Sequence, residues 1–351
     1  MIQAKVIEDS LNQDGDRLTT FEVVFPRIVL AEFNTHRMFS RNSASSRAIP
    51  FKKMVNKVKE SPFIPIAFQK DHKGMQGTSY LTGKEADLAR NSWLESKASA
   101  IEEAEDLHEF GVTKQICNRL LEPFMYHKVL ITSSQQGLEN FFKLRCPQYH
   151  YQKGTKSSRL FRSKKDFLYH SDSRDVHSNF KRYTNLQWLQ KNESQAEIHI
   201  QALAECMWDA QNESVPKDLK AGEWHIPYSD NMPGLNDYMG YELDGNEESD
   251  EWFKDQVSIA KRKISVARCA RISYQTLGDN PKIDYEADLK LYDRLASSGH
   301  WSPFEHVACA MKRSYGDYCF GIGSVANMDH QYDGGWCRNF KGFVQLRSIV
   351  D

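Results

Sequence analysis

The chain has 351 residues, enough for one large domain or two modest ones. Its 46 lysines and arginines nearly balance 47 aspartates and glutamates, so global charge does not favour a polyanionic partner. The sequence has no run of the roughly 20 apolar residues that would span a bilayer. Its start lacks the pattern of a secretory signal, so we expect a cytoplasmic protein. Seven dispersed cysteines without a C-x-x-C pair favour reduced thiols and argue against structural zinc, so no metal site is predicted.

Hydrophobic periodicity predicts the main elements in chain order. Apolar and polar residues alternate from Arg17 to Phe25, which indicates a strand that Pro26 ends. Apolar residues at helical spacing predict helices over 84–110, 137–145, 195–211 and 284–298. Glycines and aromatics in 334–351 favour a strand or hairpin.

Two segments differ in composition from their surroundings. Residues 151–193 are basic, rich in serine and tyrosine, and lack periodicity, so we interpret them as an insertion partly ordered by its aromatics. The acidic stretch 242–252 is typical of a solvated linker, which we place over 241–260. The predicted core therefore spans 1–240, and 261–351 is expected to pack into the same domain.

The densest polar motif is THRMFSRNSASSR, residues 35–47. Arginines offer paired donors to phosphate oxygens, and short hydroxyl and amide side chains fill the remaining positions at close range. By composition alone, a polar surface turn explains this segment as well as a phosphate site does.

Three further motifs carry candidate residues. GHWSPFEH (299–306) follows a helix and predicts a tight loop; alone it favours a capped turn over a metal site. In GLENFFKLRCPQYH (137–150), Asn140 and Arg145 are polar, although an arginine at a helix end ordinarily answers the helix dipole. Arg119 in ICNRLLEP has the ordinary interpretation of a helix-surface residue.

Together these motifs resemble the flavin-dependent thymidylate synthases, also called thymidylate synthase complementing proteins. Residues 35–47 are similar to the family signature R-H-R-x-x-S-x-N-x-x-S-x-R. ARISY (270–274) and SSGHWSPFEH (297–306) resemble the family's first block, and LENFFKLR with QAEI (195–198) resembles its late block. GVTKQICNRLLEP resembles the block that supplies another arginine. The resemblance covers roughly half of the chain.

The order of these blocks differs from the family's, in which the GHxSPFEH block precedes the signature. The resemblance therefore implies an α/β (α+β) fold with a mixed sheet and long helices, circularly permuted, with the acidic linker joining the old termini. Two positions depart from the signature: Thr35 replaces its first arginine, and Ser43 replaces a usual glutamate. We hypothesise that Arg338 or Arg347 in the tail supplies the missing cation.

The activity implied by the resemblance is methylation of dUMP to dTMP. Methylenetetrahydrofolate supplies the carbon, and FAD recharged by NADPH supplies the hydride. Arg145 is expected to be catalytic, and Cys146 is not required as a nucleophile. The dUMP site is expected to comprise Glu32, Ser43, Ser45, Arg47, Arg119 and Arg145. The FAD site is expected to comprise His36, Arg37, Asn42, Asn140, His300, Ser302 and Glu305. A homo-oligomer, tetramer or dimer, is expected, with the insertion near the substrate entrance.

The departures from the family signature at Thr35 and Ser43 leave other functions open. A same-fold enzyme could leave a hydroxymethyl group at C5 or act on dCMP, since a fold does not fix a function. A nucleic-acid-binding protein could use the basic insertion, with Tyr149, Tyr151, Phe161 and Tyr169 as stacking groups. A degenerate family member retained for structure is the third alternative, and the retained arginines argue against it.

Overall fold

The computed structural model describes residues 1–73, 77, 79–152, 158–170, 180–240, 247–274, 283–313, 331–332 and 336–350. Its strands are β1 (Gln3–Asn12), β2 (Arg17–Pro26), β3 (Ser40–Ser43), β4 (Tyr126–Ser134), β5 (Tyr149–Gln152), β6 (Ser158–Phe161), β7 (Lys217–Leu219), β8 (Trp224–His225), β9 (Ala308–Ala310), β10 (Lys312–Arg313), β11 (Gln331–Tyr332), β12 (Trp336–Cys337), β13 (Phe340–Lys341) and β14 (Phe343–Gln345). Its α-helices are α1 (Leu30–Asn34), α2 (Phe51–Glu60), α3 (Gly83–Glu109), α4 (Lys114–Leu120), α5 (Gln135–Arg145), α6 (Lys164–His170), α8 (Asn185–Lys191), α9 (Ile198–Glu213), α10 (Leu235–Met239), α11 (Glu247–Arg271), α12 (Tyr285–Ser297) and α13 (Arg347–Val350). Short 3-10 helices are η1 (Arg27–Val29), η2 (Glu122–Phe124), η3 (Ser229–Asn231), η4 (Ile272–Tyr274) and η5 (Ser302–His306).

A five-stranded mixed sheet in the order β3-β4-β2-β1-β7 forms the centre of the fold. The first four strands pair antiparallel, with Phe21 opposite Ile131 and Ser40 opposite Thr132. The short β7 joins β1 in parallel. Because β3 lies at the end of this order, the signature strand is an edge strand. The expected α/β class with a mixed sheet and long helices is confirmed.

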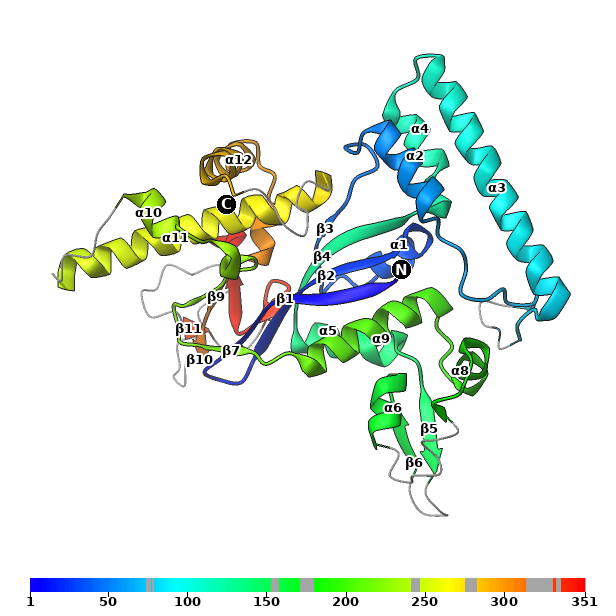
Figure 1. Ribbon diagram of the computed structural model, residues 1–351. Coiled ribbons are helices and arrows are strands. Elements are labelled where there is room, and N and C mark those ends of the chain that lie inside the picture. Colours follow the sequence, from blue (N-terminus) through cyan, green and yellow to red (C-terminus); the bar gives the residue numbers. More distant parts are fainter. Residues whose placement is uncertain are drawn as a thin grey trace.

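The two faces of the sheet are covered by different parts of the chain (Figure 1). On one face, alternate residues of β2 and β4 pack against α1, α5 and α9 in an apolar core that includes Phe21, Ile131 and Phe141. On the other face, Leu130 packs against Cys269 and Ile272 at the end of α11. The helices α2–α4 and α10–α12 lie at opposite ends of the sheet (Figure 1).

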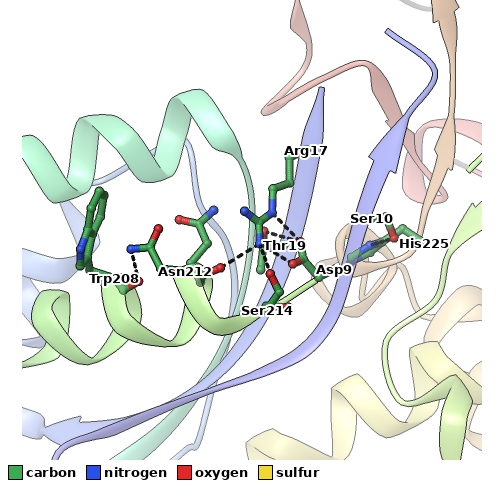
Figure 2. Close-up of polar contacts among 9 residues, drawn as sticks. Asp9, Ser10, Arg17, Thr19, Trp208, Asn212, Ser214 and His225 are labelled. Carbon is green, nitrogen blue, oxygen red and sulfur yellow. Dashed lines mark hydrogen bonds and ion pairs between the residues drawn. The ribbon is translucent and has the colours of Figure 1, made fainter. Parts of the chain in front are cut away.

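Arg17 joins the first two strands to the end of α9 (Figure 2). Its Nε and Nη2 atoms donate to the Asp9 carboxylate at 2.9 and 2.6 Å, and Nη2 also reaches the carbonyls of Gln211 and Ser214 at 2.9 and 3.2 Å. A cation there satisfies carbonyls that a helix end leaves unpaired. The neighbouring Ser10 points to the opposite face of the sheet and bonds His225.

Most elements predicted from periodicity are confirmed with small shifts at their ends. The predicted strand 17–25 is β2, and the predicted helices over 84–110, 137–145, 195–211 and 284–298 are α3, α5, α9 and α12. The predicted hairpin in 334–351 is present as β12 paired with β13, followed by β14 on β9.

The expected linker over 241–260 is wrong for the part that the structure describes. Residues 247–260 form the first half of α11, in which Phe253 and Val257 are buried. Their apolar side chains pack against Tyr285 and Leu235, which the acidic composition of 242–252 obscured. Residues 241–246 lie outside the described residues.

The segment 151–193, which we interpret as an insertion, forms an aromatic cluster together with Tyr149 just before it. Tyr149, Phe161, Phe167 and Trp188 are buried together, and their rings meet edge to face at 5.1–6.2 Å. Basic residues attach the insertion to the helices beneath it. Arg162 pairs with Glu139 of α5, and Lys164 and Lys165 pair with Glu205 and Glu213 of α9.

None of the helices in the described part of the chain is long and apolar enough to cross a membrane. Within the same residues, the structure contains no group of three or more His, Cys, Asp or Glu side chains suited to a metal ion. Among the described residues, Cys117, Cys146, Cys206 and Cys269 are free thiols, and Cys319 lies outside the part of the chain that the structure describes.

Candidate functional site

The signature segment 35–47 touches each of the other motifs, although they are far apart in sequence. Ser302 Oγ of the 299–306 loop donates to Asn42 Oδ1 at 2.5 Å, across 260 positions. The Ser45 N–H donates to the Ser273 carbonyl at 2.9 Å, which joins the signature to ARISY. Asn42 Nδ2 also donates to the Cys269 carbonyl at 3.1 Å. The fold thus gathers on one edge strand the residues that the resemblance groups.

Arg145 and His36 form the contact between the signature and the 137–150 motif. Arg145 Nε donates to His36 Nε2 at 3.0 Å. An arginine can only donate, so the ring proton of His36 is on Nδ1. Burial, reinforced by the Arg145 and Arg41 cations, lowers the pKa of His36 to about 4, and the ring is therefore neutral near pH 7. Phe141 supports the ring edge to face at 4.8 Å.

The bond to His36 fixes Arg145 and uses one of its three nitrogens. Arg145 is the last residue of α5 and is partly exposed. With Nε directed at the histidine, the two Nη groups at the far end of the guanidinium can donate to a ligand. A cation held in this way meets developing negative charge without having to reorganise.

A second group of contacts joins the signature to α4. Arg47 Nε donates to Gln115 Oε1 at 3.2 Å, and Arg119 lies one helical turn further along α4, with its side chain exposed. The buried Asn118 donates to the carbonyls of Ser46 and Ile49 at 2.7 and 3.0 Å. Asn118 therefore sets the path of the chain around Arg47, and two arginines face solvent near the same helix.

The C-terminal tail contacts the signature, as the hypothesis of a cation supplied by Arg338 or Arg347 requires. However, Arg347 pairs with a carboxylate of another loop. Gln345 Nε2 of β14 donates to Ser40 Oγ at 2.8 Å. Arg347 Nη1 pairs with Glu305 Oε1 at 2.5 Å, so this cation answers a carboxylate of the predicted flavin loop. Arg338 occupies a turn with a φ of 56° between β12 and β13.

The two departures from the signature have structural consequences. Thr35 is exposed, and its Oγ1 donates to the Glu32 carbonyl at 2.6 Å, so it closes the end of α1. Ser43 ends β3 opposite Val129. The Glu32 Oε2 atom is buried without a hydrogen-bond partner among the residues that the structure describes.

Three predicted site residues are exposed and are not drawn into these contacts. Arg37 and Asn140 face solvent, the latter five positions before Arg145 on α5. His300 is held by Ser298, whose Oγ lies 2.8 Å from its Nδ1. The structure leaves their predicted roles as predictions.

A buried row of hydroxyl and imidazole groups crosses the sheet behind the site. The Ser10 hydroxyl bonds His225 Nδ1 at 2.8 Å, and His225 Nε2 bonds Thr20 at 2.7 Å. Thr20 bonds Thr132 at 2.6 Å, and Thr132 bonds His306 Nδ1 at 2.8 Å. We call Ser10, His225, Thr20, Thr132 and His306 the polar row.

The polar row attaches the 299–306 loop to the sheet. Burial lowers the pKa of both His225 and His306 to about 3, so both rings are neutral. His306 ends η5, whose first residue is the Ser302 that bonds Asn42. The bond from Thr132 to His306 therefore helps to fix the loop against β3.

Sequence reasoning missed Asn118, Thr132 and the role of His306. His306 lies in the GHWSPFEH motif, which predicts a tight loop but no bond to the sheet, and the other two residues carry no signal beyond their residue type. Cys146 is no nucleophile, because it is 1% exposed and burial raises its pKa well above the ordinary thiol value.

Comparison with protein families gives a match to the thymidylate synthase complementing protein family over residues 18–156. The match confirms the resemblance inferred from the motifs over this segment, which holds the signature, Arg119 and Arg145. The 299–306 loop lies outside the matched range.

Solved structures that the chain matches include a UMP/dUMP methylase, PolB, from Streptomyces cacaoi. In its complex with 5-Br dUMP, this protein is 18% identical to the chain, with a TM-score of 0.37. The match covers 56% of this chain and 66% of the methylase, so the chain spans just under two thirds of that protein's length. Its complex with 5-Br UMP is 17% identical, with a TM-score of 0.40 and coverage of 61% and 89%. No curated protein sequence matches the chain.

Proposed function

We propose that the protein methylates the C5 position of dUMP, with methylenetetrahydrofolate as the carbon donor and NADPH as the reductant. The observation that carries this proposal is the convergence of the other motif blocks on residues 35–47. A surface turn, the ordinary interpretation of THRMFSRNSASSR, would not require Asn42, Ser45 and His36 to be held by segments more than 100 positions away.

In this proposal Arg145 is the catalytic residue. Transfer of a one-carbon unit to C5 places negative charge on the uracil ring, and a preorganised guanidinium stabilises that charge where it develops. His36 directs the guanidinium and remains neutral, so it does not compete for the charge. Ser45, Arg47 and Arg119 hold the nucleotide, chiefly by its phosphate, with Glu32 and Ser43 nearby.

The residues present fit a flavin cofactor. Two buried atoms at or beside the signature, Glu32 Oε2 and Arg41 Nη1, have no hydrogen-bond partner among the described residues and are available to polar groups of a ligand. FAD would be held by His36, Arg37, Asn42, Asn140, His300, Ser302 and Glu305, and it would supply the hydride that reduces the transferred carbon. The chain's own residues bind and orient; the Ser302–Asn42 bond shapes the loop that does so.

We also propose that the fold is a circular permutation of the family's. The 299–306 loop, which is early in the family's order, contacts the signature from the C-terminal side of this chain. The site is expected to be completed by a homo-oligomer, as a tetramer or dimer.

The test is mass spectrometry of the nucleotide after incubation of the protein and FAD with dUMP, methylenetetrahydrofolate and NADPH. We expect dTMP, with its rate reduced about a hundredfold or more in Arg145→Ala. Arg90→Ala, which removes an exposed arginine of α3, is the matched control and should retain full activity. Unchanged dUMP in the wild-type protein with bound FAD would refute the proposal.

A hydroxymethylated product, or turnover of dCMP in place of dUMP, would instead assign the same-fold alternative. The nucleic-acid alternative loses support, because Tyr149 and Phe161 are 2% and 1% exposed inside the insertion's core and cannot stack on bases. Tyr169 is exposed, and the side chain of Tyr151 lies outside the described residues.

A further inference from the structure

Arg41 occupies the variable position between Ser40 and Asn42 in the signature. Its backbone is fixed on β3 opposite Ile131, and both neighbours are buried and hydrogen-bonded, to Gln345 and to Ser302. Successive side chains of a strand point to opposite faces, so Arg41 leaves β3 on the face away from these two bonds. Its location is therefore set by its neighbours.

The Arg41 guanidinium lacks a partner that its burial requires. Its Nη1 atom is buried and has no hydrogen-bond partner among the residues that the structure describes. A buried cationic donor without an acceptor carries a large desolvation cost, so such groups are normally paired. Burial lowers the pKa of Arg41, and the Glu305 carboxylate opposes this only in part. Glu305 is already bonded to Arg347 at 2.5 Å.

Two further guanidinium groups lie near Arg41. Arg41 and Arg145 both lower the pKa of the neutral His36, and Arg347 is paired with Glu305. The Glu305 carboxylate is therefore shared between Arg347 and Arg41. An anion at this place would satisfy the buried Nη1 donor of Arg41.

We propose that Arg41 binds the phosphate oxygens of the ligand at this site and replaces the cation that the signature loses at Thr35. Thr35 cannot do so itself, because its hydroxyl is bonded to the Glu32 carbonyl. The phosphate belongs either to the nucleotide substrate or to the pyrophosphate of the flavin. This inference rests on the proposed function, and it deepens that function by assigning a residue that the family pattern leaves variable.

The test is calorimetric titration of Arg41→Met, Arg41→Lys and the control Arg90→Met with matched ligand pairs. The first pair is dUMP and deoxyuridine, which differ by the phosphate alone. The second pair is FAD and riboflavin, which differ by the pyrophosphate and the adenosine attached to it. Loss of one charged hydrogen-bonded contact corresponds to about tenfold to a hundredfold in affinity. Thermal melting of each variant shows whether it is folded.

We expect Arg41→Met to lose affinity by this factor for one phosphate-bearing ligand and to bind its phosphate-free counterpart as the wild type does. Loss for dUMP assigns Arg41 to the nucleotide phosphate, and loss for FAD assigns it to the pyrophosphate. Arg41→Lys should recover part of the affinity. Equal affinities of Arg41→Met and wild type for both phosphate-bearing ligands would overturn the inference.

These outcomes separate the inference from the proposed function. A wild-type protein that makes dTMP, with an Arg41→Met variant of unchanged affinity, retains the function and loses the inference. If the wild type binds neither dUMP nor FAD, the proposed function fails, and inorganic pyrophosphate becomes the probe. Pyrophosphate binding that Arg41→Met abolishes then supports an anion site, and binding that it leaves unchanged refutes one.

Discussion

Replacement of Thr132 by valine keeps the shape of the side chain and removes the hydroxyl that joins Thr20 to His306 in the polar row. That hydroxyl bonds Thr20 at 2.6 Å and His306 at 2.8 Å, and all three residues are fully buried. Loss of the bond to Thr20, which keeps its bond to His225, costs about 1 kcal/mol, and leaving the buried His306 unpaired costs about 1–3 kcal/mol. His306 would keep neither ring nitrogen paired among the described residues, because its Nε2 already has no partner there. We expect the free energy of unfolding to fall by about 2–4 kcal/mol.

Urea unfolding followed by tryptophan fluorescence measures this loss, provided that the dependence on urea concentration is unchanged. Thr82→Val is the matched control: Thr82 is exposed at the start of α3 and makes no side-chain capping bond in the described part of the chain. We expect the control to change stability by less than about 0.5 kcal/mol. The double variant with Thr20→Val should lose less than the sum of the single losses, because both remove the same bond. A Thr132→Val protein as stable as the control would refute our account of the polar row.

Three further predictions concern buried ionisable and ion-paired groups. The pKa values of His36, His225 and His306 in the folded protein are about 4, 3 and 3. As the pH falls below about 6.5, these histidines therefore bind protons in the unfolded chain before they do so in the folded protein. Thermal melts should accordingly show the melting temperature falling from pH 6.5 towards pH 4. Burial raises the pKa of Glu8 to about 7, which acts in the opposite direction, so the melts are best made in Glu8→Gln, where an unchanged melting temperature would contradict the prediction. Cys146 should resist iodoacetamide at pH 8 in the native protein and react in urea, as peptide mass spectrometry can verify; rapid native labelling would show that it is accessible. Arg347→Met should lower the free energy of unfolding by about 1–3 kcal/mol, because Glu305 loses the cation that it pairs with. Arg347→Lys, which keeps the charge, should recover part of this loss. Equal losses in the two variants would contradict the prediction that the positive charge stabilises Glu305.

The sequence predicted the elements whose periodicity is local. The alternation in β2 and the apolar stripes of α3, α5, α9 and α12 were recognisable because each buries one face. In contrast, β4 carries buried residues on both faces, from Val129 to Ser134, and therefore shows no alternation. At the start of α11 the acidic residues outnumber the apolar ones that it buries, so composition alone predicts a linker there.

The site was predictable in its parts and not in its connections. Sequence motifs identified Asn42, Ser302, His36 and Arg145, but the bonds between them join positions 109 and 260 apart. The polar row could not be predicted from residue types, because threonine is common in strands for the packing of its β-branched side chain. Residue type does not distinguish Arg41 from Arg37 and Arg47 of the same motif, whereas its buried Nη1 atom without a described partner does.

The bond between Asn42 and Ser302 also concerns the synthesis of the protein. The two residues are 260 positions apart, and ribosomes add about 5–20 residues per second, so Asn42 emerges roughly 13–50 seconds before its partner is made. During that time the growing chain presents Thr20, Thr132 and Ser40 on the uncovered face of the sheet, where the finished protein has η5, β8 and β14. Because Thr20, Thr132 and Ser40 carry hydroxyl groups, water can form hydrogen bonds with them until the last segment is made. We therefore expect this part of the exposed sheet to promote little aggregation.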